Sequence, residues 1–306
     1  MKAAIVGQQD FGKAVLEAML ARGDEITAVF CAPEKEGARA DTLRVAAQEK
    51  GIKVYQFKSL KAPEAVDAMK AANADIGIMA YVLQFAPQDF VNIPKHGTIQ
   101  YHPSLLPKYR GPSSISWPII CGEKETGLTI FRPSDGLDEG AIILQKKTPI
   151  GPDDTLGSIY FDRLFPMGVA AMLEAADQVL AGRHTETVQD ESQATYEGWC
   201  RDAESKINWA NHSSMVYNLI RGCSPAPGAW TTFNGVRLWV YEARLEKVAT
   251  FGAVKGRIGE VVESDGGKLV VSSQSGRIHV LKGKLGEGKK LAGDALGIAP
   301  GSIFGT

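Results

Sequence analysis

The sequence lacks long apolar runs, clustered cysteines and a strong excess of charge of one sign. No stretch approaches the roughly 20 uninterrupted apolar residues that a membrane span needs. The apolar run that follows Lys2 is shorter than the ~7–15 residues of a secretory signal, so we expect a cytoplasmic protein without a membrane partner. The four cysteines form no Cys-x-x-Cys pair. We therefore expect reduced thiols, and neither a disulfide framework nor a zinc site.

The length of 306 residues predicts two domains, and the 44% hydrophobic and 23% charged residues are typical of a globular chain. The formal net charge of −1 is unevenly spread, with −6 over residues 1–200 and +5 over residues 201–306. A basic C-terminal part can approach nucleic acid or an anionic cosubstrate. Five surplus charges are few for a nucleic-acid surface, however, and solvated lysines are the commoner explanation.

The first 150 residues alternate between short apolar runs and segments with helical spacing. This alternation predicts an α/β fold, a Rossmann-like domain with a mostly parallel sheet that helices cover on both faces. The expected helices are Phe11–Ala21, Arg39–Lys50 and Pro63–Ala72. The expected strands are Ala3–Val6, Ile26–Ala32, Lys53–Phe57, Ile76–Tyr81, Thr98–Tyr101, Gly127–Arg132 and Ala141–Lys147.

A longer helical pattern runs from Thr155 to Leu180. Thr155 can cap its N-terminus, and Pro166 within the pattern should kink or split the helix. The following polar stretch, Arg183–Ser192, shows no periodicity, which indicates a linker or an exposed connection.

The sequence pattern changes beyond Lys206. A helical stretch there precedes several short strand-like runs, which are separated by glycine-containing turns. This pattern predicts a small barrel or sandwich, and we expect an OB-like β-barrel. We expect domains at residues 1–203 and 204–306. The expected elements are a helix over Ser213–Arg221 and strands over Ala229–Phe233, Arg237–Leu245, Gly256–Ser264, Lys268–Ser272 and Ile278–Gly283.

Gly7 and Gly12 stand where dinucleotide-binding folds place their glycine-rich turn, but Gln9 replaces the second glycine. The second strand also ends without an acidic residue to hold a ribose. The segment is therefore predicted to be a tight turn without a nucleotide, and no NAD(P) is expected.

Two clusters of unusual residues follow. His102 comes at the carboxyl end of a predicted strand, where ligands bind in open α/β sheets, and a proline-rich loop follows it. Ser134–Gly140 places carboxylates in a glycine-containing turn between two strands. A lone histidine is more often structural. A carboxylate beside it, however, fixes its tautomer, and such a pair is the smallest set of groups that can carry out general acid–base chemistry. His96 is a weaker candidate, because it lies in the turn before the strand.

The segment Gln100–Pro107 with Arg110 and Gly111, followed by Asp135–Gly140, resembles the signature of the 10-formyltetrahydrofolate-dependent formyltransferase family. The chain is most similar to the N-terminal hydrolase domain of 10-formyltetrahydrofolate dehydrogenase, and it also resembles methionyl-tRNA formyltransferase. Further matching motifs occur in the same order along the chain, at Gln84–Phe85, Leu164–Pro166, Thr195–Gly198, Lys206–Trp209 and Pro227–Trp230.

The resemblance implies roles for several residues. His102 and Asp138 match the catalytic histidine and aspartate of the family, and no metal is needed. The implied substrate and formyl donor is 10-formyltetrahydrofolate. Its expected contacts are Asp138, Gln84, Phe85 and Ala86, together with the loop of Ser104, Leu105, Leu106 and Pro107.

Gln100 occupies the position where the family usually has an asparagine whose amide holds the formyl oxygen. Glutamine keeps the amide but lengthens the arm by one methylene, which displaces the donor by ~1 Å, a shift that is costly in catalysis. Gln100 is thus either a working oxyanion donor or a residue that packs at the edge of the site.

The acceptor of the formyl group stays open. The short loop Ala32–Arg39 has mixed charge and lacks the basic insertion of tRNA formyltransferases, which favours water and hence hydrolysis to formate and tetrahydrofolate. The basic C-terminal part favours transfer to methionyl-tRNA instead. A nucleotide-sugar formyltransferase and a catalytically silent folate-binding module are further alternatives. Because the dehydrogenase's carrier and aldehyde dehydrogenase domains are lacking, NADP-dependent oxidation is not expected unless a separate partner supplies it.

Overall fold

The computed structural model describes residues 1–248 and 255–305, which form two compact units. The predicted domain boundary divides the chain once, between residues 203 and 204. Each compact unit instead consists of several separate stretches of the chain. The first unit consists of Met1–Gly111, Gly127–Thr148 and Arg163–Tyr196. The second consists of Pro112–Thr126, Pro149–Asp162 and the chain from Glu197 onward.

The first unit is built on a seven-stranded sheet with the strand order β3-β2-β1-β4-β5-β6-β7. Strands β1 to β5 pair in parallel, and β6 is antiparallel to β5. The central strands are buried on both faces, as continuous apolar runs require. The predicted mostly parallel sheet is confirmed, with strands at Lys2–Gly7 (β1), Glu25–Cys31 (β2), Val54–Gln56 (β3), Ile76–Ala80 (β4), Thr98–His102 (β5), Glu125–Phe131 (β6) and Ile142–Pro149 (β7).

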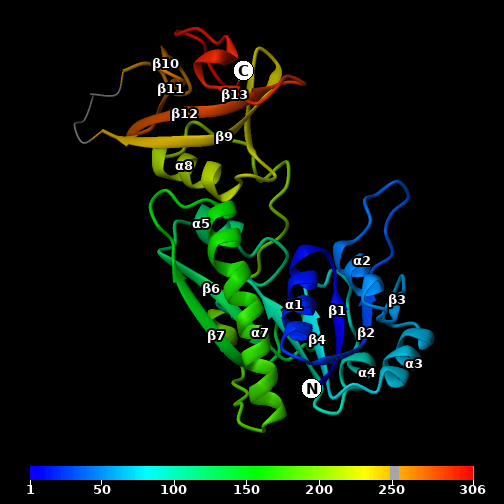
Figure 1. The fold of residues 1–306 in the computed structure, drawn as a ribbon. Helices are drawn as coiled ribbons and strands as arrows, with labels where there is room; N and C mark the ends of the chain where they lie inside the picture. Colours follow the sequence, from blue (N-terminus) through cyan, green and yellow to red (C-terminus); the bar gives the residue numbers. More distant parts are fainter. Residues whose placement is uncertain (249–254, 306) are drawn as a thin grey trace. The chain divides into compact units, whose positions relative to one another are not determined.

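Helices cover both faces of this sheet (Figure 1). On one face, Phe11 of α1 stacks on Tyr101 of β5 with ring centroids 4.3 Å apart, and α7 packs against both elements. On the other face, α3 and α4 form a core with the side chains of β1 and β2. The helix bounds are Gln9–Ala21 (α1), Thr42–Glu49 (α2), Pro63–Ala72 (α3), Gln88–Val91 (α4) and Phe165–Leu180 (α7).

The turn between β1 and α1 is as tight as the sequence predicts. A Cβ atom on Gly7 would lie 2.1 Å from the carbonyl oxygen of Ala80, so only glycine fits there. Gln9 adopts φ +58°, and its N–H donates to Oδ2 of Asp41 at 2.8 Å.

The predicted long helix is split, as expected. Thr155 caps a short helix, α6 (Leu156–Ile159), through a capping box with Ser158. A π-helical turn over Tyr160–Leu164 follows, and α7 then begins with Pro166 in its first turn, where a missing N–H costs no hydrogen bond.

The second unit contains an antiparallel sheet in the order β10-β11-β12-β9-β8, with β13 paired to β12. Helix α8 (Ser213–Gly222) packs against β9 and also against α5 (Ser116–Ile120), which is why an earlier segment belongs to this unit. The strands are Ala229–Phe233 (β8), Val236–Lys247 (β9), Val261–Asp265 (β10), Lys268–Ser273 (β11), Gly276–Leu285 (β12) and Leu291–Ala292 (β13).

One detail of the second unit differs from prediction. The expected strand over Gly256–Ser264 begins only at Val261, because Gly256 and Gly259 adopt φ +89° and +78° in a turn. The sheet runs from β10 to β8, and the segment 301–305 joins its two edges, because Ser302 accepts the N–H of Val261 and Gly305 donates to the carbonyl of Thr232 in β8. Over residues 1–248 and 255–305, no helix is long and apolar enough to cross a membrane.

Candidate active site

The carboxyl end of β5 presents Gln100 and His102 on one face of the sheet, because side chains two residues apart on a strand point the same way. Tyr101 points to the opposite face, against α1. Thr98 shares the face of His102, and its hydroxyl donates to the carbonyl of Val91 in α4 at 2.6 Å. Gln100 and His102 therefore lie on the α3–α4 side of the sheet.

His102 and Asp138, which the sequence predicts as a pair, are brought together. Nδ1 of His102 lies 3.5 Å from Oδ2 of Asp138, and the two side chains are 7% and 9% exposed. The remaining ring nitrogen, Nε2, lies 2.9 Å from the carbonyl oxygen of Tyr109. A carbonyl can only accept, so Nε2 is the donor in this contact, and Nδ1 is the ring nitrogen that faces the carboxylate.

Asp138 lies in the connection between β6 and β7. Its backbone adopts φ +57°, and its Oδ2 also accepts the N–H of Gly111 at 2.9 Å. The chain turns sharply after it, where a Cβ on Gly140 would lie 1.5 Å from the carbonyl oxygen of Arg132. The glycine in the predicted acidic turn thus allows a close approach of two backbone segments.

The loop after β5 is fixed by hydrogen bonds to β6. The hydroxyl of Thr129 donates to the carbonyl of Ser104 at 2.7 Å and accepts the N–H of Leu106 at 3.1 Å. Ser104 and Leu106 are buried, whereas Leu105 and Pro107 are half-buried. Of the four residues that the resemblance assigns to the folate-contacting loop, only Leu105 and Pro107 therefore offer side-chain surface.

Gln84, Phe85 and Ala86 follow β4 on the same side of the sheet. The amide of Gln84 donates to the carbonyl of Phe57 at 2.8 Å, and Ala86 is buried in the core beneath α3 and α4. Phe85 is 48% exposed, and Nζ of Lys61 lies 4.7 Å from its ring centroid. Phe85 is thus the member of this segment with an accessible side chain, and no hydrogen bond in the described chain links the segment to His102 or Asp138.

Gln100 pairs through its backbone with Met79 of β4 and Phe131 of β6. Its side chain is half-buried, and its amide has no hydrogen-bond partner in the part of the chain that the structure describes. A donor without an internal partner is available to a ligand.

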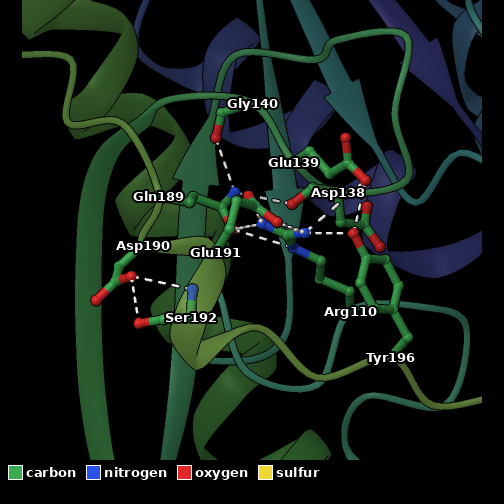
Figure 2. A network of polar contacts seen from close by, with 9 residues as sticks. All are labelled: Arg110, Asp138, Glu139, Gly140, Gln189, Asp190, Glu191, Ser192 and Tyr196. Atoms are coloured by element: carbon green, nitrogen blue, oxygen red, sulfur yellow. Dashed lines mark hydrogen bonds and ion pairs between the residues drawn. The ribbon is translucent and has the colours of Figure 1, made fainter.

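The sequence prediction missed a buried network around Arg110 (Figure 2). The Arg110 side chain is fully buried, and its Nη2 lies 2.6 Å from Glu191 and 2.8 Å from Oε1 of Gln189. Its Nη1 contacts the hydroxyl of Tyr196, which donates to Glu139 at 2.6 Å. Hydrogen bonding to Glu191 raises the pKa of Arg110, and Arg110 in turn lowers the pKa of Glu191. The hydrogen bond to Glu139 raises the pKa of Tyr196.

The segment Arg183–Ser192 is exposed along most of its length, as predicted, but Gln189 within it is buried. Thr187 forms a β-bridge with Ile142, and Gln189 is 5% exposed. Arg110 and Tyr196 both belong to motifs that the sequence analysis identified. The residues around Gln189, in contrast, show no local pattern that indicates burial.

No group of three or more His, Cys, Asp and Glu side chains in residues 1–248 and 255–305 is arranged to hold a metal ion. Cys200 and Cys223 lie with their Sγ atoms 3.6 Å apart as free thiols in the core of the second unit.

Fold and site together define an α/β protein with a histidine–aspartate pair at the carboxyl end of a parallel strand. Comparison with known proteins specifies the family: residues 1–175 match Formyl transferase, and residues 200–297 match Formyl transferase, C-terminal domain. The chain belongs to the formyl transferase family.

Two kinds of relative are informative. The mitochondrial 10-formyltetrahydrofolate dehydrogenase of Mus musculus is 38% identical over 250 residues, which are 80% of this chain and 27% of that protein. The chain therefore spans about a quarter of the length of the dehydrogenases it matches. The methionyl-tRNA formyltransferase of Geotalea uraniireducens is 33% identical over 100% of this chain and 98% of that protein.

Solved structures share the fold. HypX from Aquifex aeolicus in complex with tetrahydrofolic acid superposes with a TM-score of 0.69 and 18% identity, over 97% of this chain and 46% of that one. The sugar 3N-formyl transferase WlaRD, with dTDP and 5-N-formyl-THF, gives a TM-score of 0.69 and 19% identity, over 91% of this chain and 96% of that one. The predicted Rossmann-like formyltransferase architecture with an antiparallel C-terminal unit is confirmed.

Proposed function

We propose that this chain hydrolyses 10-formyltetrahydrofolate to formate and tetrahydrofolate. The observation that carries the proposal is the buried pair of His102 and Asp138, 3.5 Å apart at the carboxyl end of β5. Membership of the formyl transferase family and the 38% identity to a 10-formyltetrahydrofolate dehydrogenase support the choice of substrate.

The proposed reaction uses the pair for general acid–base catalysis without a metal. Asp138 orients a water molecule, which attacks the formyl carbon and gives up a proton to the carboxylate. His102 in its protonated form stabilises the negative charge that develops on the formyl oxygen. The bond between the carbon and the folate nitrogen then breaks, and a proton passes through the pair to that nitrogen.

The neighbouring residues have supporting roles in this proposal. The free amide of Gln100, on the same face of β5, donates to the formyl oxygen. Phe85, Leu105 and Pro107 supply apolar surface to the folate, and Gln84, Ala86, Ser104 and Leu106 shape the backbone beneath it, because their side chains are buried or already hydrogen-bonded.

The test is formate release from 10-formyltetrahydrofolate by the purified chain, with and without methionyl-tRNA. We expect steady formate release without tRNA and no formylated methionyl-tRNA when it is added. Background formate release until tRNA is supplied would contradict hydrolysis and establish the transferase.

Transfer to methionyl-tRNA is the second candidate function, because the Geotalea methionyl-tRNA formyltransferase aligns over nearly its whole length. One face of the second unit also combines cations with aromatic rings. Lys284 lies 4.9 Å from the ring centroid of Trp239, and Lys290 lies 3.7 Å from that of Tyr241. Such surfaces are typical of nucleic-acid binding.

Two remaining alternatives have less support. The likeness to WlaRD concerns the fold alone, so a sugar amine as acceptor has no separate support from the site. A silent folate-binding module would bind 10-formyltetrahydrofolate without formate release or transfer to any acceptor. The close approach of His102 and Asp138 favours a working enzyme.

A further inference from the structure

The backbone of Asp138 adopts φ +57°, in the left-handed region. Aspartate adopts this region more readily than most residues with a side chain, but the Cβ atom still crowds the backbone there. The direction of the carboxylate toward His102 depends on this conformation. A stable pairing with His102 therefore requires groups that hold the backbone of Asp138 in place.

Gln189 meets this requirement. Its Nε2 donates to the carbonyl oxygens of Asp138 and Gly140, each at 2.8 Å, and so spans the turn that carries the carboxylate (Figure 2). Both amide hydrogens are used, and the side chain is buried. A buried amide with both hydrogens bound fixes the two carbonyls it joins.

Arg110 sets the orientation of the Gln189 amide. Its Nε and Nη2 donate to Oε1 of Gln189 at 3.2 and 2.8 Å, so the amide oxygen faces the guanidinium and the NH₂ group faces the two carbonyls. Glu191 fixes the guanidinium from the other side. The next residue along the chain, Gly111, donates its N–H to the Asp138 carboxylate at 2.9 Å.

We propose that Gln189 is a positioning residue that holds Asp138 in its left-handed conformation, with its carboxylate directed at His102. Gln189 has no contact with His102 and acts only through the carbonyls of Asp138 and Gly140. This inference rests on the proposed catalytic role of Asp138. It assigns a function to a segment that the sequence marks as a linker.

The substitution Gln189→Glu tests the proposal sharply, because it separates the two ends of the side chain. A glutamate keeps the length and the acceptor for Arg110, but it places a carboxylate oxygen against two carbonyl oxygens. We expect kcat for formate release to fall about 100-fold with KM little changed, as a misplacement of ~1 Å in a catalytic group predicts. The matched control is Gln48→Glu, the same change at an exposed position of α2, where the side-chain oxygen accepts from Arg44, a contact that glutamate keeps; this variant should keep the wild-type kcat.

Two further readouts distinguish positioning from a general structural defect. Protonation of the introduced carboxylate restores a donor toward the carbonyls, so the ratio of variant to wild-type kcat should rise as the pH is lowered. The amide of Gly111 should exchange its hydrogen faster in Gln189→Glu than in Gln48→Glu, because its acceptor, the Asp138 carboxylate, has moved. Gln189→Met, which carries neither donor nor charge, should show the same loss of kcat without the pH-dependent recovery.

Wild-type kcat and wild-type exchange at Gly111 in Gln189→Glu or Gln189→Met would overturn the positioning role while leaving the proposed hydrolysis intact. Failure of the wild-type chain to release formate would instead refute the proposed hydrolysis. The Gly111 exchange rates in the folded variants would then still decide whether Gln189 holds Asp138.

Discussion

Asp138 and His102 form the centre of the site, and each is held by a backbone group of the loop after β5. The Gly111 N–H fixes the carboxylate, and the Tyr109 carbonyl fixes the protonated Nε2 of the ring. Two side chains on different elements are thus oriented by residues only two apart in the chain. For the proposed acid–base catalysis, this arrangement fixes the geometry before substrate binds.

Replacing either member of the pair should abolish most activity. We expect His102→Ala and Asp138→Asn each to lower kcat for formate release by roughly 100-fold or more, since each group acts in the transition state. The double variant should be little worse than either single one, because the two groups act as a unit. Steady-state kinetics, with thermal unfolding to verify the fold, measure both effects.

His96→Ala is the matched control for this prediction. His96 lies in the turn before β5, where its backbone carbonyl accepts from Arg132 at 2.8 Å, and its imidazole forms no hydrogen bond within residues 1–248 and 255–305. Turnover by His96→Ala should stay near the wild-type rate. Near-normal turnover by His102→Ala would remove His102 from the mechanism.

Gln100 gives a second prediction at this scale. If its amide donates to the formyl oxygen, Gln100→Leu should lower kcat by at least about tenfold while KM changes little, because the interaction strengthens only in the transition state. The measurement is kcat and KM for 10-formyltetrahydrofolate. An unchanged kcat would show that Gln100 only packs at the edge of the site.

At the scale of single elements, the connection between β2 and α2 is held by Glu34. Its carboxylate accepts the N–H of Asp41 at 3.0 Å and the amide of Gln56 at 2.7 Å, and it pairs with Arg44. These contacts, led by the Asp41 N–H, lower the pKa of Glu34 from 4.5 to about 2. Asp41 in turn caps α2 and binds the N–H of Gln9.

Glu34 should make the stability of the first unit pH-dependent. Because its folded pKa lies below its unfolded pKa, its contribution is fully present above pH ~4.5 and is lost as the pH falls toward about 2. Glu34→Gln should therefore lower the free energy of unfolding at pH 7 and reduce its decline between pH 4.5 and 2. Denaturant unfolding across this range checks both, and parallel wild-type and variant curves would contradict the assignment.

Helix α7 offers a test of packing against propensity. A Cβ on Gly168 would lie 2.7 Å from the ring of Tyr101 and 3.0 Å from that of Phe11. Gly168→Ala should therefore destabilise the chain by about 1–3 kcal/mol, although alanine is the better helix former. At exposed Ala170 on the same helix, propensity alone decides, and Ala170→Gly should cost about 1 kcal/mol. A Gly168→Ala variant more stable than wild type in thermal unfolding would contradict the close packing.

Elements with a strong local signal were predicted well. Helix α3 begins at Pro63 and ends at Ala72 as expected, the Thr155 cap is present, and a π-helical turn interrupts the long helix just before Pro166. The strand expected from Gly256 failed because two glycines with positive φ turn the chain before Val261. Local patterns show propensity and periodicity, but they do not show which glycines take a left-handed conformation.

At the scale of the whole molecule, long-range contacts mark the limit of what the sequence reveals. His102 and Asp138 were found through their motifs and their place at a strand end. Gln189 was missed because its partners lie 49 to 79 residues earlier in the chain, and its neighbours are polar and aperiodic. Burial of such a residue follows only from the assembled fold, since no local pattern encodes it.

Charge distribution bears on the choice between water and tRNA as acceptor. The chain carries +5 over residues 201–306, and Lys284 and Lys290 lie over the rings of Trp239 and Tyr241. Binding of tRNA releases counterions and weakens steeply as salt rises, whereas attack by water involves no polyanion.

Salt dependence should therefore identify the acceptor. For hydrolysis, kcat/KM for formate release should change by no more than about twofold between roughly 50 and 200 mM salt, and a double Lys284→Glu, Lys290→Glu variant should behave like wild type. If the chain is a transferase that binds tRNA through this face, its affinity for tRNA should fall about tenfold or more over the same salt range. The double variant should then show weakened tRNA binding already at low salt. Formate release that persists unchanged through both perturbations would leave water as the acceptor, because no polyanion contact would then contribute to the reaction.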